Sequence, residues 1–137
     1  MTRLRSAAAG AAGTLVWSAL EPLDKRVFQH DYSDVAMLGK LVTRGRAWPV
    51  AGLAIHVVNG ATFGVAYAEL RKRRNVSALQ AALAEHLILF PLGLAVDRAH
   101  PARGGPGLAR LFSLRGFGQA TVRHAVFGVV LGALAGD

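Results

Sequence analysis

The chain has 137 residues, of which 53% are hydrophobic and 18% charged, and its formal net charge is +8. The length fits a single domain over residues 1–137. Average soluble domains carry about 25% charged residues, so this composition excludes a disordered chain and disfavours an ordinary soluble domain. The absence of cysteine excludes disulfides, cysteine nucleophiles and iron–sulfur clusters.

The basic residues are distributed as short groups between apolar segments, for example Arg3 with Arg5 and the run 71–74. Such groups are typical of the flanks of membrane spans, where anionic headgroups attract them. The chain has no basic stripe interleaved with aromatic residues, so we expect no nucleic-acid partner. The expected partner is the lipid bilayer.

The apolar segments predict an all-α, polytopic membrane protein with four transmembrane helices. The segment 47–68 contains no Lys, Arg, Asp or Glu and is long enough to cross a hydrocarbon core of about 30 Å. A soluble helical bundle would need polar outer faces, and this segment has none. The four predicted spans are residues 6–20, 47–68, 77–96 and 116–136.

The segments between the spans predict short interfacial helices and one tight turn. Ser33 can cap a short amphipathic helix within residues 25–48, and residues 106–115 repeat its pattern. Residues 71–76 form a basic turn that makes the second and third spans an antiparallel hairpin. The start of the chain also fits a signal peptide, but no small-x-small cleavage site follows, which favours a retained first helix.

The spans carry an internal repeat. The pattern His-x3-Gly-x3-Gly begins at His56 in the second span and at His124 in the fourth. The halves are about 6–70 and 77–137, and each contains two spans. Two spans per half give both halves the same orientation, so we expect parallel repeats of one helix hairpin about an axis along the membrane normal.

Glycines four residues apart form a small-residue ridge on the second and fourth spans. Such ridges let helix backbones approach closely in lipid. We expect these two spans to pack on each other through their ridges, or on a second subunit, which predicts a homo-oligomer. The predicted packing glycines are Gly52, Gly60, Gly64, Gly128, Gly132 and Gly136.

Polar residues near the middle of the spans predict a buried cluster. Ionisable groups there cost about 2.5–3.5 kcal/mol each on insertion scales, so they should face the protein interior and pair. We expect an ion pair between Glu85 and Arg123, with Gln119 beside it. Trp17 is expected in packing, and His30 and His100 in solvated loops. The cluster comprises His56, Asn59, Glu85, His86, Gln119, Arg123 and His124.

The cluster allows three main functions. The first is structural, in a small scaffold-like membrane protein. The second is a transporter or channel subunit with a His/Glu/Arg relay. The third is a cofactor site with His56 and His124 as axial ligands of haem b, although the glycine ridges leave little room for a porphyrin. Lipid or quinone binding is a further alternative. No catalytic motif is present, so we expect no enzyme and no metal site.

The motif H-x3-G-x3-G-x2-Y-A, which begins at His56 and ends at Ala68, and the second H-x3-G-x3-G at His124 resemble a known group of proteins. These are loosely related uncharacterised bacterial inner-membrane proteins of four helices, of the kind called domains of unknown function. Pro91-Leu92 in the third span fits the same resemblance. It implies a four-helix membrane fold in a bacterial cytoplasmic (inner) membrane and no particular activity.

Overall fold

The computed structural model describes residues 2–136, so Met1 and Asp137, the two ends of the predicted domain, lie outside the described residues. Within residues 2–136 the fold is all-helical, and the only β pairing is an isolated bridge between Tyr32 and Leu108. The elements are α1 (Arg3–Phe28), α2 (Asp34–Val42), α3 (Trp48–Arg71), α4 (Ala78–Leu89), η1 (Phe90–Leu92), α5 (Gly93–Ala99) and α6 (Leu114–Ala135).

Three helical segments are long and apolar enough to cross a membrane, which confirms the predicted class of protein. They are Trp48–Arg71, Ala78–Ala99 and Leu114–Ala135. The predicted first span lies inside α1, which is not among them. Its uncharged stretch is short and diluted by Gly, Ser and Thr, and Arg5 and Glu21 bound it closely. Four spans are therefore not confirmed by length and composition alone.

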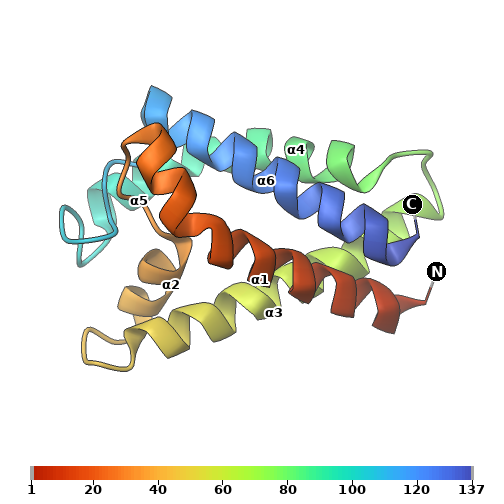
Figure 1. Ribbon diagram of the computed structural model, residues 1–137, viewed down its shortest axis with the longest axis horizontal. Coiled ribbons are helices and arrows are strands. Elements are labelled where there is room, and N and C mark those ends of the chain that lie inside the picture. The colour runs from red at the N-terminus through yellow and green to blue at the C-terminus, as the bar shows by residue number, and fades with distance from the viewer. Residues whose placement is uncertain (1, 137) are drawn as a thin grey trace.

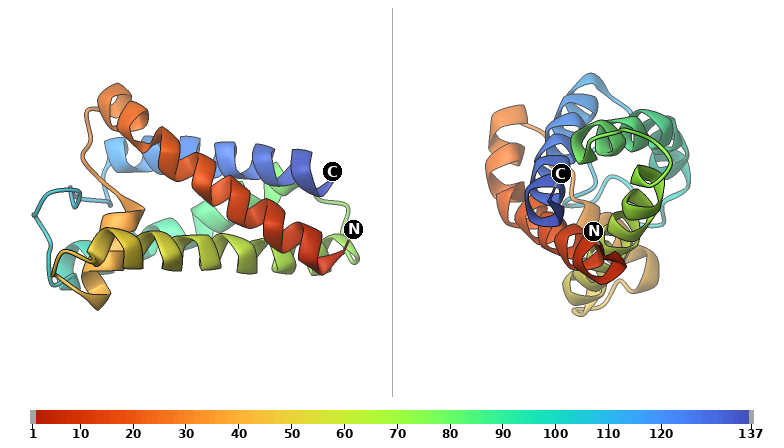
Figure 2. Two further views of the ribbon diagram at one scale, coloured as in Figure 1. Left: turned by 60° about the horizontal axis from the view of Figure 1, so that its bottom comes forward. Right: turned by 90° about the vertical axis from the view of Figure 1, so that its right-hand side faces the viewer.

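The long helices lie side by side, and successive ones run in opposite directions (Figures 1 and 2). The start of α1, the end of α6 and the loop between α3 and α4 lie at one end, and α2 and α5 lie at the other. Helix α1 packs on both α3 and α6, α2 packs on α3, and α4 packs on α6. The predicted packing of the second span (α3) on the fourth (α6) is therefore wrong, because α1 lies against both.

The glycine ridges are used within the chain. A Cβ at Gly60 would collide with the side chain of Thr14 and the carbonyl oxygen of Gly10 in α1. A Cβ at Gly128 would lie 2.7 Å from Cα of Leu79 in α4. Close approach through glycine was predicted, but the surface that each ridge meets belongs to α1 or α4 rather than to the other ridge.

The other predicted packing glycines divide into two kinds. Gly52 approaches α2 at Val35, Gly64 approaches α1 at Ser6, and Gly132 is buried. Gly136 differs, because it caps α6 in the left-handed conformation with φ of 84° and is exposed. Its place in the four-residue spacing therefore coincides with a helix end, and the prediction that it packs a helix is wrong.

The repeat is only partly visible in the packing. Its halves would pair α1 with α3 and α4 with α6, and both pairs pack. A two-fold relation would also make the α1–α6 contact equivalent to one between α3 and α4. Helices α1 and α6 pack extensively, whereas α3 and α4 do not. The repeat architecture is therefore not confirmed, and α3 and α4 are left apart.

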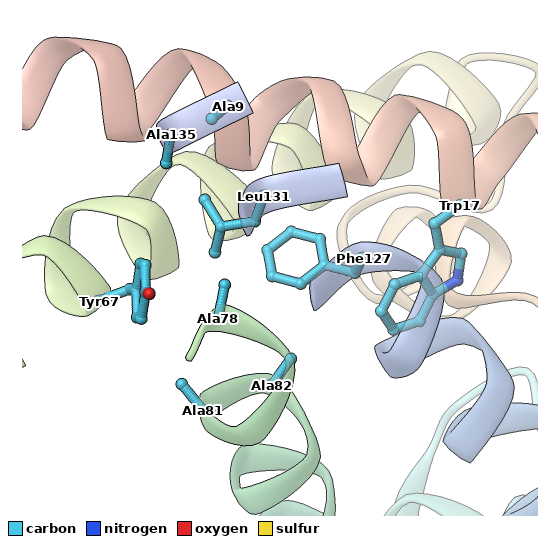
Figure 3. Close-up of a cluster of buried hydrophobic side chains, with 9 residues drawn as sticks. All are labelled: Ala9, Trp17, Tyr67, Ala78, Ala81, Ala82, Phe127, Leu131 and Ala135. Carbon is cyan, nitrogen blue, oxygen red and sulfur yellow. The ribbon is translucent and has the colours of Figure 1, made fainter. Parts of the chain in front are cut away.

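The apolar core lies between α1, α3, α4 and α6 and is built largely from alanine (Figure 3). Small side chains bring the helices close, and Phe127 and Leu131 of α6 fill the centre. Trp17 closes the core on one side, where it packs edge-on against Phe127 with ring centroids 6.3 Å apart. The indole thus stands between the apolar core and the polar half of the bundle.

The segments between the long helices confirm one prediction and contradict another. Ser33 caps α2 by accepting the Ala36 N–H at 3.1 Å, as expected. The predicted second interfacial helix at 106–115 does not form before Leu114. Instead, the Asp97 carboxylate accepts the backbone N–H groups of Leu111 and Phe112 at 2.7 and 2.8 Å. These bonds hold the segment in a non-helical conformation.

Candidate functional site: a cavity with a polar floor

A cavity of about 340 Å³ lies within the helical bundle. Its walls come from every helix, with Thr14 and Trp17 from α1 and Phe63 from α3 among the lining residues. All seven residues of the predicted polar cluster line it: His56, Asn59, Glu85, His86, Gln119, Arg123 and His124. The structure therefore brings all seven of these side chains to one cavity.

The cavity opens sideways. Most lining residues are buried or half-buried, and the three exposed ones are Asn59 of α3, Leu89 of α4 and Leu92 of η1. These mark a mouth between α3 and the α4–η1 segment, the two walls that do not pack on each other. Pro91 lies in this segment, where the helix tightens to a 3-10 turn. The mouth is thus framed by side walls of the bundle rather than by its ends.

Arg123 forms the strongest polar contacts of the site, but not with the predicted partner. Its Nε and Nη2 donate to both carboxylate oxygens of Asp24, at 2.6 and 2.7 Å. Nη1 donates to Asp34 at 2.9 Å, and Nη2 also donates to the carbonyl of Tyr32 at 3.0 Å. The predicted Glu85–Arg123 pair is wrong, because α1 and the start of α2 supply two carboxylates on the side of α6 that Arg123 faces.

Gln119 belongs to the same network, as the sequence analysis expected for a residue one turn from Arg123. Its Nε2 donates to Asp24 at 2.7 Å and to the carbonyl of His30 at 3.0 Å. Asp24 and Arg123 are both buried. A buried charge pair is costly to break, since the remaining charge is left without compensation. The network therefore fixes α1 against α6.

The acids of this network were missed in the sequence. Asp24 lies beyond the predicted first span, which ends at residue 20. One available signal was helical spacing, because Asp24 lies two turns after Trp17 and shares its face. Pro22 lies inside α1, which continues to Phe28. Asp34 lies at the start of the predicted interfacial helix and carried no signal of its own.

Glu85 is left without a hydrogen bond or ion pair among the described residues. It is half-buried on α4 and faces the cavity near its mouth. The charged network on the opposite side already contains two carboxylates for one guanidinium. The cavity walls therefore carry more acid than base, which disfavours an anionic occupant.

Three histidines and Trp17 form a row of ring contacts across the cavity. The ring centroids of His86 and His124 are 4.9 Å apart, those of His124 and Trp17 4.8 Å, and those of Trp17 and His56 5.1 Å. His56 and His124 thus contact the indole from different helices. Axial ligation of haem b would require both rings to face one iron, and Trp17 occupies the space beside each. The site does not fit the haem alternative.

Two of these histidines are oriented by hydrogen bonds. Nδ1 of His124 donates to the carbonyl of Ala120 at 2.7 Å, which leaves Nε2 as an acceptor. Thr121 donates its hydroxyl proton to Phe117 at 2.8 Å and therefore accepts from Nε2 of His86 at 2.9 Å. Both rings are thereby held in a fixed orientation on one side of the cavity.

Three buried polar atoms of the lining lack a hydrogen-bond partner among the described residues: Nε1 of Trp17, the hydroxyl of Tyr32 and Nε2 of His56. The side chains themselves are more than nine-tenths buried, at 7%, 3% and 8% exposure. Buried polar groups in folded proteins are almost always hydrogen-bonded. Their common position at one cavity suggests that an occupant supplies the missing bonds.

Charge states around the end of the cavity follow from burial. Burial raises the pKa of the Tyr32 hydroxyl, which therefore keeps its proton. Burial, and then the positive charges of Arg123 and Arg115, lower the pKa of His30.

His30 and His100 were predicted to lie in solvated loops, but both side chains are buried. His100 bridges two segments, since its Nε2 lies 2.9 Å from the carbonyl of Met37 and its Nδ1 accepts the Ala102 N–H.

Among residues 2–136, no group of three or more His, Asp or Glu side chains is placed to hold a metal ion. Comparison of the chain with family models, with curated proteins and with solved structures finds no match. The cavity and its contacts therefore carry the functional argument.

Proposed function

We propose that this chain is an integral membrane protein that binds a small lipophilic molecule in the cavity between α3 and α4. The observation that supports this most directly is the group of unpartnered buried polar atoms of Trp17, Tyr32 and His56 around one cavity. The resemblance stated above and the Ala-, Gly- and Arg-rich composition favour the cytoplasmic membrane of a bacterium as its location.

The geometry favours binding over a purely structural role. A polar cluster that only fixes helix register should be closed and fully paired. The contacts of Arg123 with Asp24 and Asp34 meet this description. The unpartnered nitrogens of Trp17 and His56 and the unpaired Glu85 do not. The sequence alone favours a scaffold role, and the cavity makes ligand binding the better proposal.

The second candidate is a proton or solute pathway, and the unpaired Glu85 carboxyl beside His86 favours it. Such a pathway would carry protons or solute across a vesicle membrane, whereas a binding protein would not. Proteoliposomes containing the wild type and Glu85→Gln distinguish the two. A proton or solute flux that the substitution abolishes would support the pathway, and equal background flux in both would support binding alone.

We further propose that α1 is the fourth span, because it packs on α3 and α6 and runs along the length of the bundle beside them (Figure 2). The chain has no cysteine, so single cysteines can report its topology. Four spans place Thr2→Cys and Asn75→Cys on one side of the membrane, and Gly45→Cys and Gly104→Cys on the other. Labelling of intact cells with an impermeant maleimide that groups residue 2 with 45 and 104 would show that α1 does not cross.

Ligand binding is tested by native mass spectrometry of the protein released from detergent micelles. We expect a bound mass in the wild type that is lost in Ala120→Phe, because Ala120 lines the cavity. Ala133→Phe is the matched control, since Ala133 lies exposed on the same helix outside the lining. Equal bound mass in both variants, or none in the wild type, would contradict the proposal.

The same spectra test the proposed homo-oligomer. The glycine ridges are occupied by α1, α2 and α4, so subunits would associate through exposed apolar residues such as Val50 and Val58 of α3. A mass equal to an integer multiple of the chain would support association. A monomer in mild detergents and in nanodiscs would contradict it.

A further inference from the structure

The mouth of the cavity lies near the middle of the two apolar helical segments that frame it. Asn59 is close to the midpoint of α3, and Leu89 is close to the midpoint of the apolar segment Ala78–Ala99. A molecule entering between them comes from the hydrocarbon core rather than from the headgroup layer. Phospholipid headgroups stay at the interface, whereas uncharged lipids can reach this depth.

The floor of the cavity offers hydrogen-bond donors. The indole N–H of Trp17 can only donate, and the protonated hydroxyl of Tyr32 can donate. Neither atom has a partner among the described residues, and the unpartnered Nε2 of His56 lies beside Trp17. An oxygen acceptor on the ligand would satisfy these groups.

The charges of the cavity exclude a phosphate as that acceptor. Arg123 is the only guanidinium of the lining, and its hydrogen bonds go to Asp24, Asp34 and the carbonyl of Tyr32. Two carboxylates therefore surround one guanidinium, and Glu85 adds a third acid on the facing wall. A phosphate or carboxylate headgroup would therefore find no free guanidinium to pair with.

We propose that the cavity selects an uncharged lipid whose carbonyl or hydroxyl oxygens accept hydrogen bonds from Trp17 and Tyr32, with its chain leaving through the mouth between Asn59 and Leu89. This inference rests on the proposed binding function and specifies its ligand class. The shared chemistry fits both an isoprenoid or alkyl quinone and a diacylglycerol. The test therefore contains a probe for each of these sources.

The fluorescence of Trp17 can report whether a ligand enters the cavity. It has two tryptophans, so Trp48→Phe leaves Trp17 as the only indole. Nanodiscs of phosphatidylcholine would contain this variant with one of three probes: decylubiquinone, diacylglycerol with dibrominated acyl chains, or phosphatidylglycerol with the same chains. Quinones and bromine both quench indole fluorescence. The reciprocal variant Trp17→Phe reports only on Trp48, which lies outside the cavity lining.

We expect saturable quenching of Trp17 by one or both uncharged probes at low mole fraction, and only weak, non-saturating quenching by phosphatidylglycerol. Saturation by decylubiquinone alone identifies a quinone-type ligand, and saturation by diacylglycerol alone identifies a glyceride. Trp48 should be quenched equally and without saturation by the two brominated lipids, as for any residue near lipid.

Two variants test the contacts. Tyr32→Phe should weaken binding of the effective probe about tenfold, as expected for the loss of one hydrogen bond of about 1.4 kcal/mol. Tyr67→Phe is the matched control, because the Tyr67 hydroxyl donates to Val76 away from the cavity. It should leave the affinity unchanged. Gel filtration and helical circular dichroism establish that each variant is folded.

The outcomes separate the two claims. Saturable quenching by phosphatidylglycerol at the affinity of the uncharged probes, or equal affinity in Tyr32→Phe and wild type, overturns the selection of an uncharged acceptor while leaving binding intact. Absence of saturable quenching by all three probes, with no effect of Ala120→Phe, overturns the proposed binding function itself.

Discussion

Arg123 and Asp24 form a bidentate ion pair between the first and last long helices, with N–O distances of 2.6 and 2.7 Å. Both side chains are buried, at 3% and 8% exposure. The pair links the first long helix to the last, since it joins residues 99 positions apart in the sequence. It also holds the floor of the cavity in place, because both Gln119 and the carbonyl of Tyr32 hydrogen-bond to it.

Removal of one member of this pair should be strongly destabilising. Asp24→Asn leaves the guanidinium only partly compensated by Asp34, and we expect a loss of about 3–5 kcal/mol in the free energy of unfolding. The double variant Asp24→Asn with Arg123→Gln should recover much of this loss. Unfolding by dodecyl sulfate titration in mixed micelles measures the difference.

Glu85→Gln is the control for this ion pair. Glu85 has no partner among the described residues, so we expect a change within about 0.5 kcal/mol, as for substitutions away from stabilising contacts. The Asp24–Arg123 pairing would be contradicted if Glu85→Gln destabilises as strongly as Asp24→Asn. It would also be contradicted if the separate losses of Asp24→Asn and Arg123→Gln simply add in the double variant.

Gly60 permits the close approach of α3 to α1. Any β-carbon at this position would meet Thr14 and the Gly10 carbonyl, so Gly60→Leu should force the helices apart. We expect a destabilisation of about 1–3 kcal/mol, typical of overpacking. Thermal unfolding in detergent measures it. Val58→Leu on the exposed face of the same helix should change the midpoint little, and equal effects of the two variants would contradict the contact.

Most of the fold class follows from the sequence, because an uncharged segment such as 47–68 has few physical alternatives to a membrane helix. The seven polar side chains named from the sequence all line one cavity. The pairing inside the cluster does not follow. Matching depth suggested Glu85 for Arg123, but which helices are neighbours decides the partner, and depth alone contains no such information.

The helix neighbours were not predictable from the glycine ridges either. A ridge shows that some backbone approaches closely, but Gly60 and Gly128 do not identify that backbone. The structure supplies α1 for the first and α4 for the second. Likewise, the burial of His30 and His100 depends on how the loops fold over α2, which a local pattern of polar residues does not encode.

Acidification should destabilise the protein through His30. Its pKa in the folded state is lowered below the ordinary value by burial and by Arg123 and Arg115. The unfolded chain therefore binds more protons than the folded one as the pH falls below about 6.5, and stability decreases with decreasing pH in that window. His30→Gln should reduce this slope in unfolding curves recorded between pH 7.5 and 5.5.

Arg115→Gln provides an independent check on the cause. Removal of this positive charge lets the pKa of His30 rise towards its ordinary value, so the slope should also decrease while the histidine is still present. An unchanged slope in both variants would show that other groups determine the pH dependence.

Asp97 restrains the segment 100–113 by accepting the N–H groups of Leu111 and Phe112. Asp97→Ala leaves these donors unpaired, and we expect the segment to open locally while the bundle stays folded. Trypsin reports this opening, because Arg103 and Arg110 lie exposed in the segment. Cleavage there should be several-fold faster than in the wild type.

Asp31 accepts the Gly107 N–H at 2.9 Å, so Asp31→Ala should accelerate cleavage at Arg103 and Arg110 as well. Unchanged rates in both variants would show that neither carboxylate holds the segment, and that its packing against Gly93 through Leu111 is sufficient.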